Sequence, residues 1–101
     1  MSGGCGFPTV EDRIAQEVLY SGRVQGVGFR QSVCNVACKQ GVQGYVQNLD
    51  NGKVRLVAGG KSKPVNCFLD RVKSIWADNI SAIDKRDMQF DDQFSVFSVR
   101  Y

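Results

Sequence analysis

The 101-residue sequence contains no histidine, and this absence excludes a large group of enzymes. Histidine is the most frequent general base in catalysis, because its ordinary pKa lies near physiological pH. A chain without it cannot build a histidine triad or form a phosphohistidine. Any reaction at this protein therefore has to proceed without that base.

Long apolar segments and a basic stripe are missing as well. No apolar run approaches the roughly 20 residues that a membrane-spanning helix needs. The net charge is only +3 and both signs are spread along the chain, which gives no support for nucleic acid binding. Residues 1–12 lack the features of a secretory signal and are predicted to form a flexible leader. We therefore expect a cytoplasmic protein with no membrane or nucleic acid partner.

Ligands for a metal ion are scarce. The chain has four cysteines, of which Cys34 and Cys38 lie one turn apart on a predicted helix, where a disulfide would be strained. We expect all of them to be free thiols: Cys5, Cys34, Cys38 and Cys67. A zinc site would need further ligands, and the acidic residues do not cluster as magnesium ligands do. No metal and no cofactor are expected.

The apolar pattern changes period along the chain, and these changes predict one domain over residues 13–101. Two segments repeat apolar residues as the buried face of a helix does, and segments with strand character separate them. The predicted elements are a strand at 13–21, a helix at 29–40, a strand at 42–49, a strand from Val54 that Gly59 and Gly60 end, a helix that Ser62 or Lys63 caps, and strands at 80–87 and 94–101.

This order is β-α-β-β-α-β with an extra C-terminal strand. Two helices with one apolar stripe each can cover only one face of a four- or five-stranded sheet. The predicted fold is therefore a ferredoxin-like α+β sandwich, with both helices on one face of an antiparallel sheet. A turn at Asn51-Gly52 is predicted to join the second and third strands.

Residues 22–30, Gly-Arg-Val-Gln-Gly-Val-Gly-Phe-Arg, connect the first strand to the first helix. The glycines allow the backbone to bend tightly and to turn its N–H groups to one side. The helix adds free N-terminal amides and the positive end of its dipole, and Arg30 adds a permanent charge. Such groups together would bind a phosphate. A plain glycine-rich connection beside an exposed arginine would contain the same residues, so the pattern alone leaves both interpretations open.

Familiar phosphate-binding motifs do not fit this chain. Gly60-Lys61-Ser62 ends like a P-loop, but the first glycine of that motif would fall on Arg55. Gly26-Val27-Gly28 begins like a dinucleotide-binding motif, but its third glycine would fall on Gln31. No cysteine lies within residues 22–30, so a cysteine-dependent phosphatase has no support either.

Two longer motifs resemble the acylphosphatase family. The first is the segment 22–30 quoted above, and the second is Gly-Tyr-Val-Gln-Asn-Leu-Asp-Asn-Gly at 44–52. They have the family's spacing, and the ending Phe-Ser-Val-Arg-Tyr at 97–101 is also similar. The resemblance runs from about residue 13 to residue 101. It implies hydrolysis of acyl phosphates to a carboxylate and inorganic phosphate, without metal or cofactor.

The resemblance also implies a role for each site residue. Arg30 would hold the phosphoryl oxygens together with the backbone amides of Gln25, Gly26, Val27, Gly28, Phe29 and Arg30. Asn48 would orient the attacking water, although outside this motif an asparagine before a hairpin is usually a turn residue. Because the leaving carboxylate has a pKa of about 4, no general acid is required. We expect a monomer whose small-molecule acyl phosphate substrate competes with inorganic phosphate or sulfate.

Two segments depart from the common pattern of the family. Asp50-Asn51-Gly52 stands where Pro-Asp-Gly is frequent. Residues 75–79, Ile-Trp-Ala-Asp-Asn, stand where a Gly-Pro-rich connection is more usual.

Two other functions stay open at this point. A catalytically idle binding or regulatory module could use the same scaffold, since fold does not imply function, and domains of this type also occur inside larger maturation enzymes that handle carbamoyl phosphate. RNA binding would require aromatic side chains on the central strands, where the third strand has Val54, Leu56 and Val57 instead.

Overall fold

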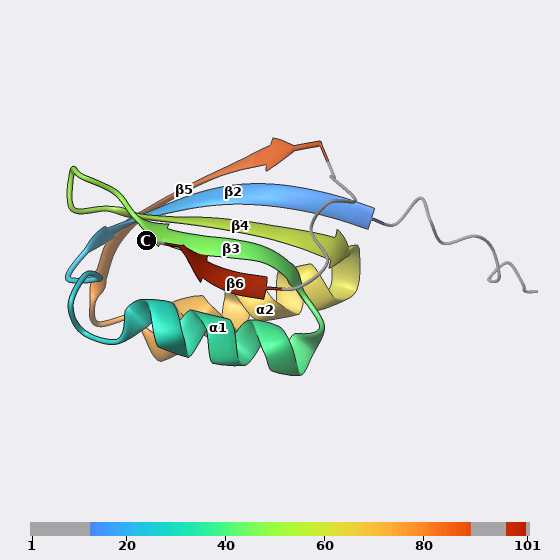
Figure 1. The fold of residues 1–101 in the computed structure, drawn as a ribbon, viewed down its shortest axis with the longest axis horizontal. Helices are drawn as coiled ribbons and strands as arrows, with labels where there is room; N and C mark the ends of the chain where they lie inside the picture. The colour runs from blue at the N-terminus through green and yellow to red at the C-terminus, as the bar shows by residue number, and fades with distance from the viewer. Residues whose placement is uncertain (1–12, 90–96, 101) are drawn as a thin grey trace, which may run out of the picture.

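Two helices lie against one face of a five-stranded sheet in the computed structural model, which describes residues 13–89 and 97–100 (Figure 1). Along the chain the elements are β2 (Arg13–Gly22), α1 (Phe29–Gln40), β3 (Gln43–Asn48), β4 (Val54–Lys61), α2 (Ser62–Ile75), β5 (Ile80–Met88) and β6 (Phe97–Arg100). The predicted ferredoxin-like α+β sandwich with an additional strand is confirmed. The predicted leader, residues 1–12, lies outside the described residues.

The sheet has the strand order β5-β2-β4-β3-β6 and is mixed. Its first three pairings are antiparallel, but β6 pairs with β3 in parallel, with Val99 opposite Val46. The prediction of an antiparallel sheet is therefore wrong for this edge. The reason is directional: β2 and β3 run one way and β4 and β5 the other. A chain that reverses once more after β5 enters β6 in the direction of β3.

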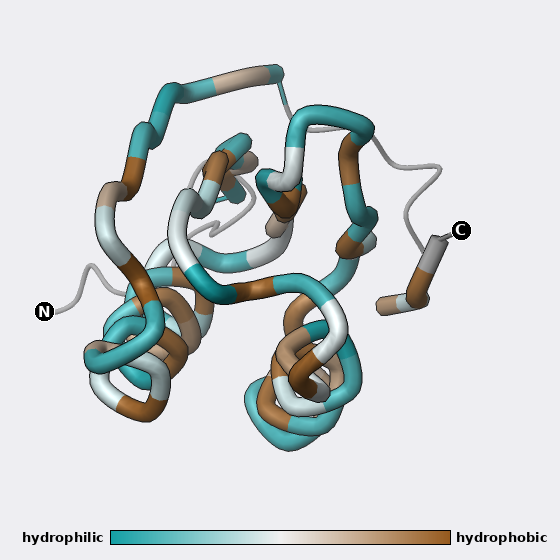
Figure 2. The backbone as a smooth tube through the Cα atoms, turned by 90° about the vertical axis from the view of Figure 1, so that its left-hand side faces the viewer, coloured by the Kyte–Doolittle hydropathy of each residue, from teal (hydrophilic) through white to brown (hydrophobic). Residues whose placement is uncertain are grey.

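The core lies between the helices and the sheet. Each helix buries one apolar stripe: Phe29, Val33, Val36 and Ala37 on α1, and Val65, Phe68, Leu69 and Val72 on α2. These side chains pack on β2 and β4, where Val18, Tyr20, Val54 and Leu56 are buried as well. Figure 2 shows the two helices end-on, side by side below the sheet. The predicted apolar stripes are thus the surfaces that the fold buries.

Two glycines expected to end a strand lie inside it instead. Gly59 pairs with Ala15 of β2 on one side and with Gln43 of β3 on the other. Backbone hydrogen bonds to both neighbours outweigh the low strand propensity of glycine. As a result β4 continues to Lys61 and α2 begins at Ser62. The N-cap of α2 is Lys61, so the predicted cap at Ser62 or Lys63 is wrong.

The described thiols and helices agree with the sequence pattern. Cys34, Cys38 and Cys67 are free, as predicted. Burial, with a smaller contribution from neighbouring Cys38, raises the pKa of the Cys34 thiol. Within the described residues, neither helix has the length and apolar character that a membrane span requires.

Gly44 sets how closely β3 approaches β4. Its φ is +134°, in the region that favours glycine, and a Cβ at this position would overlap the carbonyl group of Val57. Gly44 pairs with Ala58 and Asn48 with Val54 in one continuous register. The close approach at Gly44 therefore helps to hold the strand that carries Asn48.

Gly44→Ala should lower the free energy of unfolding by more than about 3 kcal/mol, because it adds backbone overlap to an unfavourable φ. Gly52→Ala is the matched control, since Gly52 also has a positive φ (+88°) but its Cβ would meet open space. That variant should lose only about 1 kcal/mol from backbone strain. Urea-induced unfolding measures both values. Equal losses would show that the strands can separate at Gly44 without cost.

Candidate active site

The loop between β2 and α1 exposes its backbone at one end of the molecule. Gly26 and Gly28 have φ values of +75° and +86°, a conformation that glycine adopts easily and other residues rarely do. Val24 is buried and attaches the loop to the core. Gly26, Val27 and Gly28 are exposed. The glycine-rich stretch therefore presents peptide groups, with little side chain to cover them.

The first turn of α1 has free amides and no acidic residue. Gly28 is the N-cap and has no side chain that could accept a hydrogen bond. The first hydrogen bond of the helix runs from the Ser32 N–H to the Gly28 carbonyl, at 3.0 Å. The N–H groups of Phe29, Arg30 and Gln31 precede it and have no helical acceptor. Together with the helix dipole they make this end attractive to an anion.

A pocket of about 140 Å³ lies against the loop and the start of α1. Arg30, the second residue of α1, is half-buried and is one of the residues that line this pocket. The residues that line it are Val24, Gly26, Gly28, Phe29, Arg30, Gln31 and Val99. None of these lining residues is acidic, so peptide N–H groups and one permanent positive charge dominate its electrostatics.

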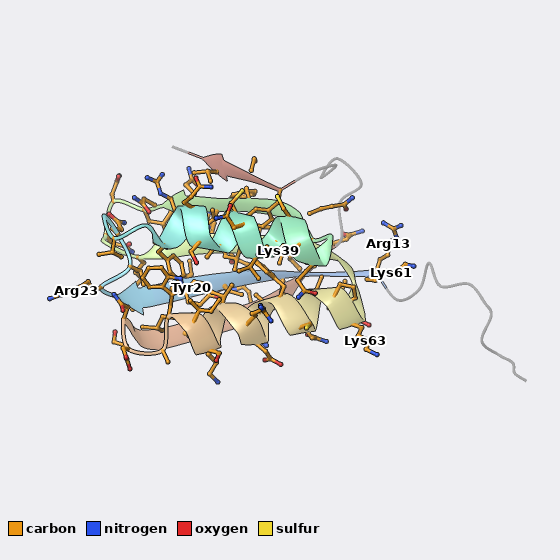
Figure 3. All side chains as sticks on the ribbon, turned by 90° about the horizontal axis from the view of Figure 1, so that it is seen from below. Arg13, Tyr20, Arg23, Lys39, Lys61 and Lys63 are labelled. Carbon is orange, nitrogen blue, oxygen red and sulfur yellow. The ribbon has the colours of Figure 1, made fainter. Side chains whose placement is uncertain are left out.

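Three aromatic rings support the start of α1. The Phe29 ring is buried and meets Tyr20 edge-on, with 5.2 Å between ring centroids. It also meets Trp76 edge-on, with 5.3 Å between ring centroids. Burial raises the pKa of Tyr20 well above its ordinary value, so its phenol stays neutral. Figure 3 shows Tyr20 over β2 between the two helices.

Asn48 ends β3 on the side of the sheet that the helices cover. It lies two residues after buried Val46, and alternate residues of a strand share a face. Its Oδ1 is buried and has no hydrogen-bond partner among the described residues. An unsatisfied buried acceptor costs about 1–3 kcal/mol. A donor such as a water molecule would therefore be favoured at this atom.

The side chain of Gln25 joins the loop to the β3–β4 hairpin. Its Nε2 donates to the carbonyl oxygens of Leu49, at 2.8 Å, and Lys53, at 2.9 Å. The Leu49 N–H also donates to the Lys53 carbonyl, at 2.8 Å. Gln25 thereby closes the end of the hairpin and fixes the loop beside the residue that follows Asn48. Figure 1 shows the loop and the hairpin at the same end of the molecule.

The structure brings together some of the predicted site residues and separates others. Gly26, Gly28, Phe29 and Arg30 line the pocket. Gln25, Val27 and Asn48 are not among its lining residues. The side chain of Arg23 points away from the body of the molecule (Figure 3).

Sequence reasoning missed Val99 and the side-chain role of Gln25. Val99 reaches the pocket because β6 pairs with β3, a contact that no local pattern indicates. For Gln25 the only local signal was its place inside the glycine motif. No group of three or more histidine, cysteine, aspartate or glutamate side chains that could hold a metal ion occurs in the described part of the chain.

Residues 16–99 match the model of the acylphosphatase family. The chain belongs to this family. The acylphosphatase of Methanococcoides burtonii is 36% identical over 91% of this chain and 97% of that protein. The acylphosphatase of Archaeoglobus fulgidus is 48% identical over a shorter stretch, 60% of this chain and 68% of that protein. The crystal structure of acylphosphatase from Bacillus subtilis has a TM-score of 0.78 at 29% identity, and the match covers 87% and 99% of the two chains.

The resemblance drawn from two motifs is thus confirmed, and so is the predicted fold. Family membership also supports an enzyme that hydrolyses acyl phosphates over an idle binding module. The acylphosphatase motif at 22–30 coincides with the loop that lines the pocket.

Gln25→Glu should lower the free energy of unfolding by about 2 kcal/mol, because a carboxylate would face two carbonyl oxygens in place of the donor. Gln89→Glu makes the same chemical change at an exposed position after β5 and should stay within about 0.5 kcal/mol of the wild type. Chemical denaturation compares the two variants. A similar loss in both would mean that Gln25 contributes nothing to holding the loop on the hairpin.

Proposed function

We propose that this member of the acylphosphatase family hydrolyses small acyl phosphates at the pocket between the β2–α1 loop, the start of α1 and β6. One observation carries the proposal. Two left-handed glycines, the uncapped amides of α1 and Arg30 meet at one pocket, and the described residues that line it include no carboxylate. This combination suits a phosphoryl group, which carries negative charge on several oxygens.

The phosphoryl group is held by the backbone amides of Gln25 to Arg30 and by the Arg30 guanidinium. The transition state of phosphoryl transfer is loose, with charge spread over three equatorial oxygens. Preorganised N–H donors and a fixed cation stabilise such charge without reorganisation of solvent. The support from the described geometry is the orientation of this end of α1, which buried Phe29 fixes.

Asn48 orients the attacking water through its side-chain amide. The buried Oδ1 of Asn48 supports this role, because it has no hydrogen-bond partner among residues 13–89 and 97–100 and can accept a hydrogen bond from that water. The water oxygen forms a bond to phosphorus while the bond between phosphorus and the bridging oxygen breaks. The electron pair of the breaking bond leaves with the carboxylate. A proton of the water passes to a phosphate oxygen, so the products are a carboxylate and dihydrogen phosphate. Asn48 itself gives up no proton.

This chemistry explains how a chain without histidine can be an enzyme. A carboxylate with a conjugate acid of pKa about 4 leaves without protonation, so no general acid is required. The substrate's own phosphate oxygen takes the proton, so no side-chain base is required either. The protein then only has to position the phosphoryl group and the attacking water, and to stabilise the negative charge of the transition state.

We further propose that the protein acts as a cytoplasmic monomer, that inorganic phosphate or sulfate competes with the substrate, and that no cofactor, nucleic acid or membrane takes part. Free Cys34, Cys38 and Cys67 suit a reducing compartment. On the face of the sheet opposite the helices, Glu17 lies 3.0 Å from Arg55 and 3.6 Å from Arg86. It neutralises part of the positive charge on the face where RNA-binding domains of similar architecture bind RNA.

Arg30→Gln should reduce kcat/KM for benzoyl phosphate by at least about 10³-fold, because the permanent charge at the pocket is lost. The matched control is Arg71→Gln, which removes one positive charge from an exposed position on α2 and should keep wild-type turnover. Loss of ultraviolet absorbance follows the reaction, with EDTA present throughout. Turnover that EDTA abolishes, or that survives in Arg30→Gln, would contradict the proposal.

Asn48→Ala should lower kcat by about 10²-fold through loss of water orientation. Because the loop and Arg30 are untouched, the inhibition constant of inorganic phosphate should stay within about twofold of the wild type. Asn66→Ala, at an exposed site on α2, controls for the loss of an asparagine side chain. An Asn48→Ala enzyme with full kcat would exclude Asn48 from the reaction.

A further inference from the structure

The connection between α2 and β5, residues 76–79, contacts the phosphate loop at its entry and the first turn of α1 at its exit. We propose that Asn79 and Trp76 are positioning residues that hold the loop in its phosphate-binding shape; this rests on the phosphate-binding role proposed above. Neither residue lines the pocket, so both would act through the backbone and the side chains that they hold.

Asn79 holds the entry to the loop through two reciprocal hydrogen bonds. The backbone N–H of Arg23 donates to the Asn79 carbonyl at 2.8 Å, and the Asn79 Nδ2 donates to the Arg23 carbonyl at 3.0 Å. Gly22 packs so closely here that a Cβ on it would overlap the Asn79 carbonyl oxygen. Both polar backbone groups of Arg23 are thus occupied by a single residue. This fixes the direction in which the chain enters the glycine-rich segment.

Trp76 holds the exit of the loop. Its Nε1 donates to the Ser32 hydroxyl oxygen at 2.9 Å, and its ring packs edge-on against Phe29. Ser32 is also the residue whose N–H makes the first hydrogen bond of α1, to Gly28. The tryptophan therefore fixes the first turn of the helix, where the free amides and Arg30 lie.

The two contacts are not independent, because Trp76 and Asn79 belong to one tight turn. The carbonyl oxygen of Trp76 accepts hydrogen bonds from the N–H groups of Asn79, at 2.9 Å, and Ile80, at 3.0 Å. The Trp76 N–H donates to Val72, which continues the hydrogen bonding of α2. Figure 1 shows this connection at the end of the molecule that carries the loop. The turn therefore connects the two ends of the loop: Asn79 contacts Arg23 at its entry, and Trp76 contacts the first turn of α1 at its exit. In this way it fixes the distance between the two ends.

The loop needs such contacts at both ends because its own glycines leave it conformationally free. Glycine has more conformational freedom to lose than any other residue, and Gly26 and Gly28 both lie between the two contacts. Without the contacts of Asn79 and Trp76, part of the free energy of phosphate binding would be lost to ordering the loop.

The first test is Asn79→Ala, which removes the side-chain donor to Arg23 and leaves the backbone bond in place. The inhibition constant of inorganic phosphate and the KM of benzoyl phosphate should both rise about fivefold, the effect of losing one hydrogen bond. The kcat should change less than twofold, because Arg30 and Asn48 are unchanged and the loop has its phosphate-binding shape once substrate is bound. Asn66→Ala on the exposed side of α2 should leave all three constants unchanged.

The second test is a double-mutant cycle between Trp76 and Ser32. Trp76→Phe keeps an aromatic ring against Phe29 but loses the N–H donor, and Ser32→Ala removes the acceptor. If the hydrogen bond positions the loop, each single variant should raise the inhibition constant of inorganic phosphate about threefold to fivefold. The double variant should raise it no further than either single variant does. Hydrogen exchange of the amides of residues 24–29, without phosphate, should be faster in these variants and in Asn79→Ala.

The outcomes separate this proposal from the one on which it rests. A wild type that neither hydrolyses benzoyl phosphate nor binds inorganic phosphate overturns the proposed function, and the positioning role with it. A wild type that does both, with unchanged inhibition constants and exchange rates in the variants, overturns the positioning role alone. A loss of kcat at unchanged KM in Asn79→Ala would also overturn it, because the residue would then act on the chemical step.

Discussion

Phe29 begins α1, is only 1% exposed, and packs edge-on against both Tyr20 and Trp76. Each aromatic pair adds about 0.5–1.5 kcal/mol to the burial of its apolar surface. Because Phe29 is the first residue of the helix, its burial fixes how the helix is rotated about its own axis. That rotation decides where the free amides and the Arg30 side chain point. The exposed glycines before it could not fix this direction themselves, so the chemistry of the loop depends on the core residue next to it.

Around this residue, three segments far apart in the sequence meet at one end of the sandwich. The β2–α1 loop brings peptide N–H groups, the β3–β4 hairpin brings Asn48, and the α2–β5 connection brings no reacting group. Gln25 joins the first segment to the second, and Asn79 and Trp76 join the first to the third. In the proposed reaction the backbone and one permanent cation do most of the work, so no titrating side chain is needed. A scaffold of this kind has to be rigid, because the catalytic power of backbone amides lies in their prearrangement.

Local signals predicted the secondary structure well and strand pairing less well. The bounds of α1 were predicted from its helical period and from the glycines on both sides, which act within a single turn. The expected end of the third strand at Gly59 and Gly60 was wrong, because partners in β2 and β3 hold these glycines in the ladder. The parallel pairing of β6 with β3 was also missed. Pairing is decided between segments that are distant in the chain, and an apolar strand carries little information about which neighbour it will meet.

The sequence by itself determined the family, the order of helices and strands, and the residues proposed for the reaction, since two long motifs carry Arg30 and Asn48 at fixed spacing. It could not indicate that the Gln25 side chain hydrogen-bonds to the β3–β4 hairpin, that Val99 lines the pocket, or that Asn79 and Trp76 contact the two ends of the loop. These contacts join residues 24 to 56 positions apart where hydrogen bonds are involved. Such partners come together only when both helices and the whole sheet are packed. Local motifs therefore determined the type of chemistry, whereas the tertiary structure determined the contacts that hold the loop in the fixed shape that such chemistry requires.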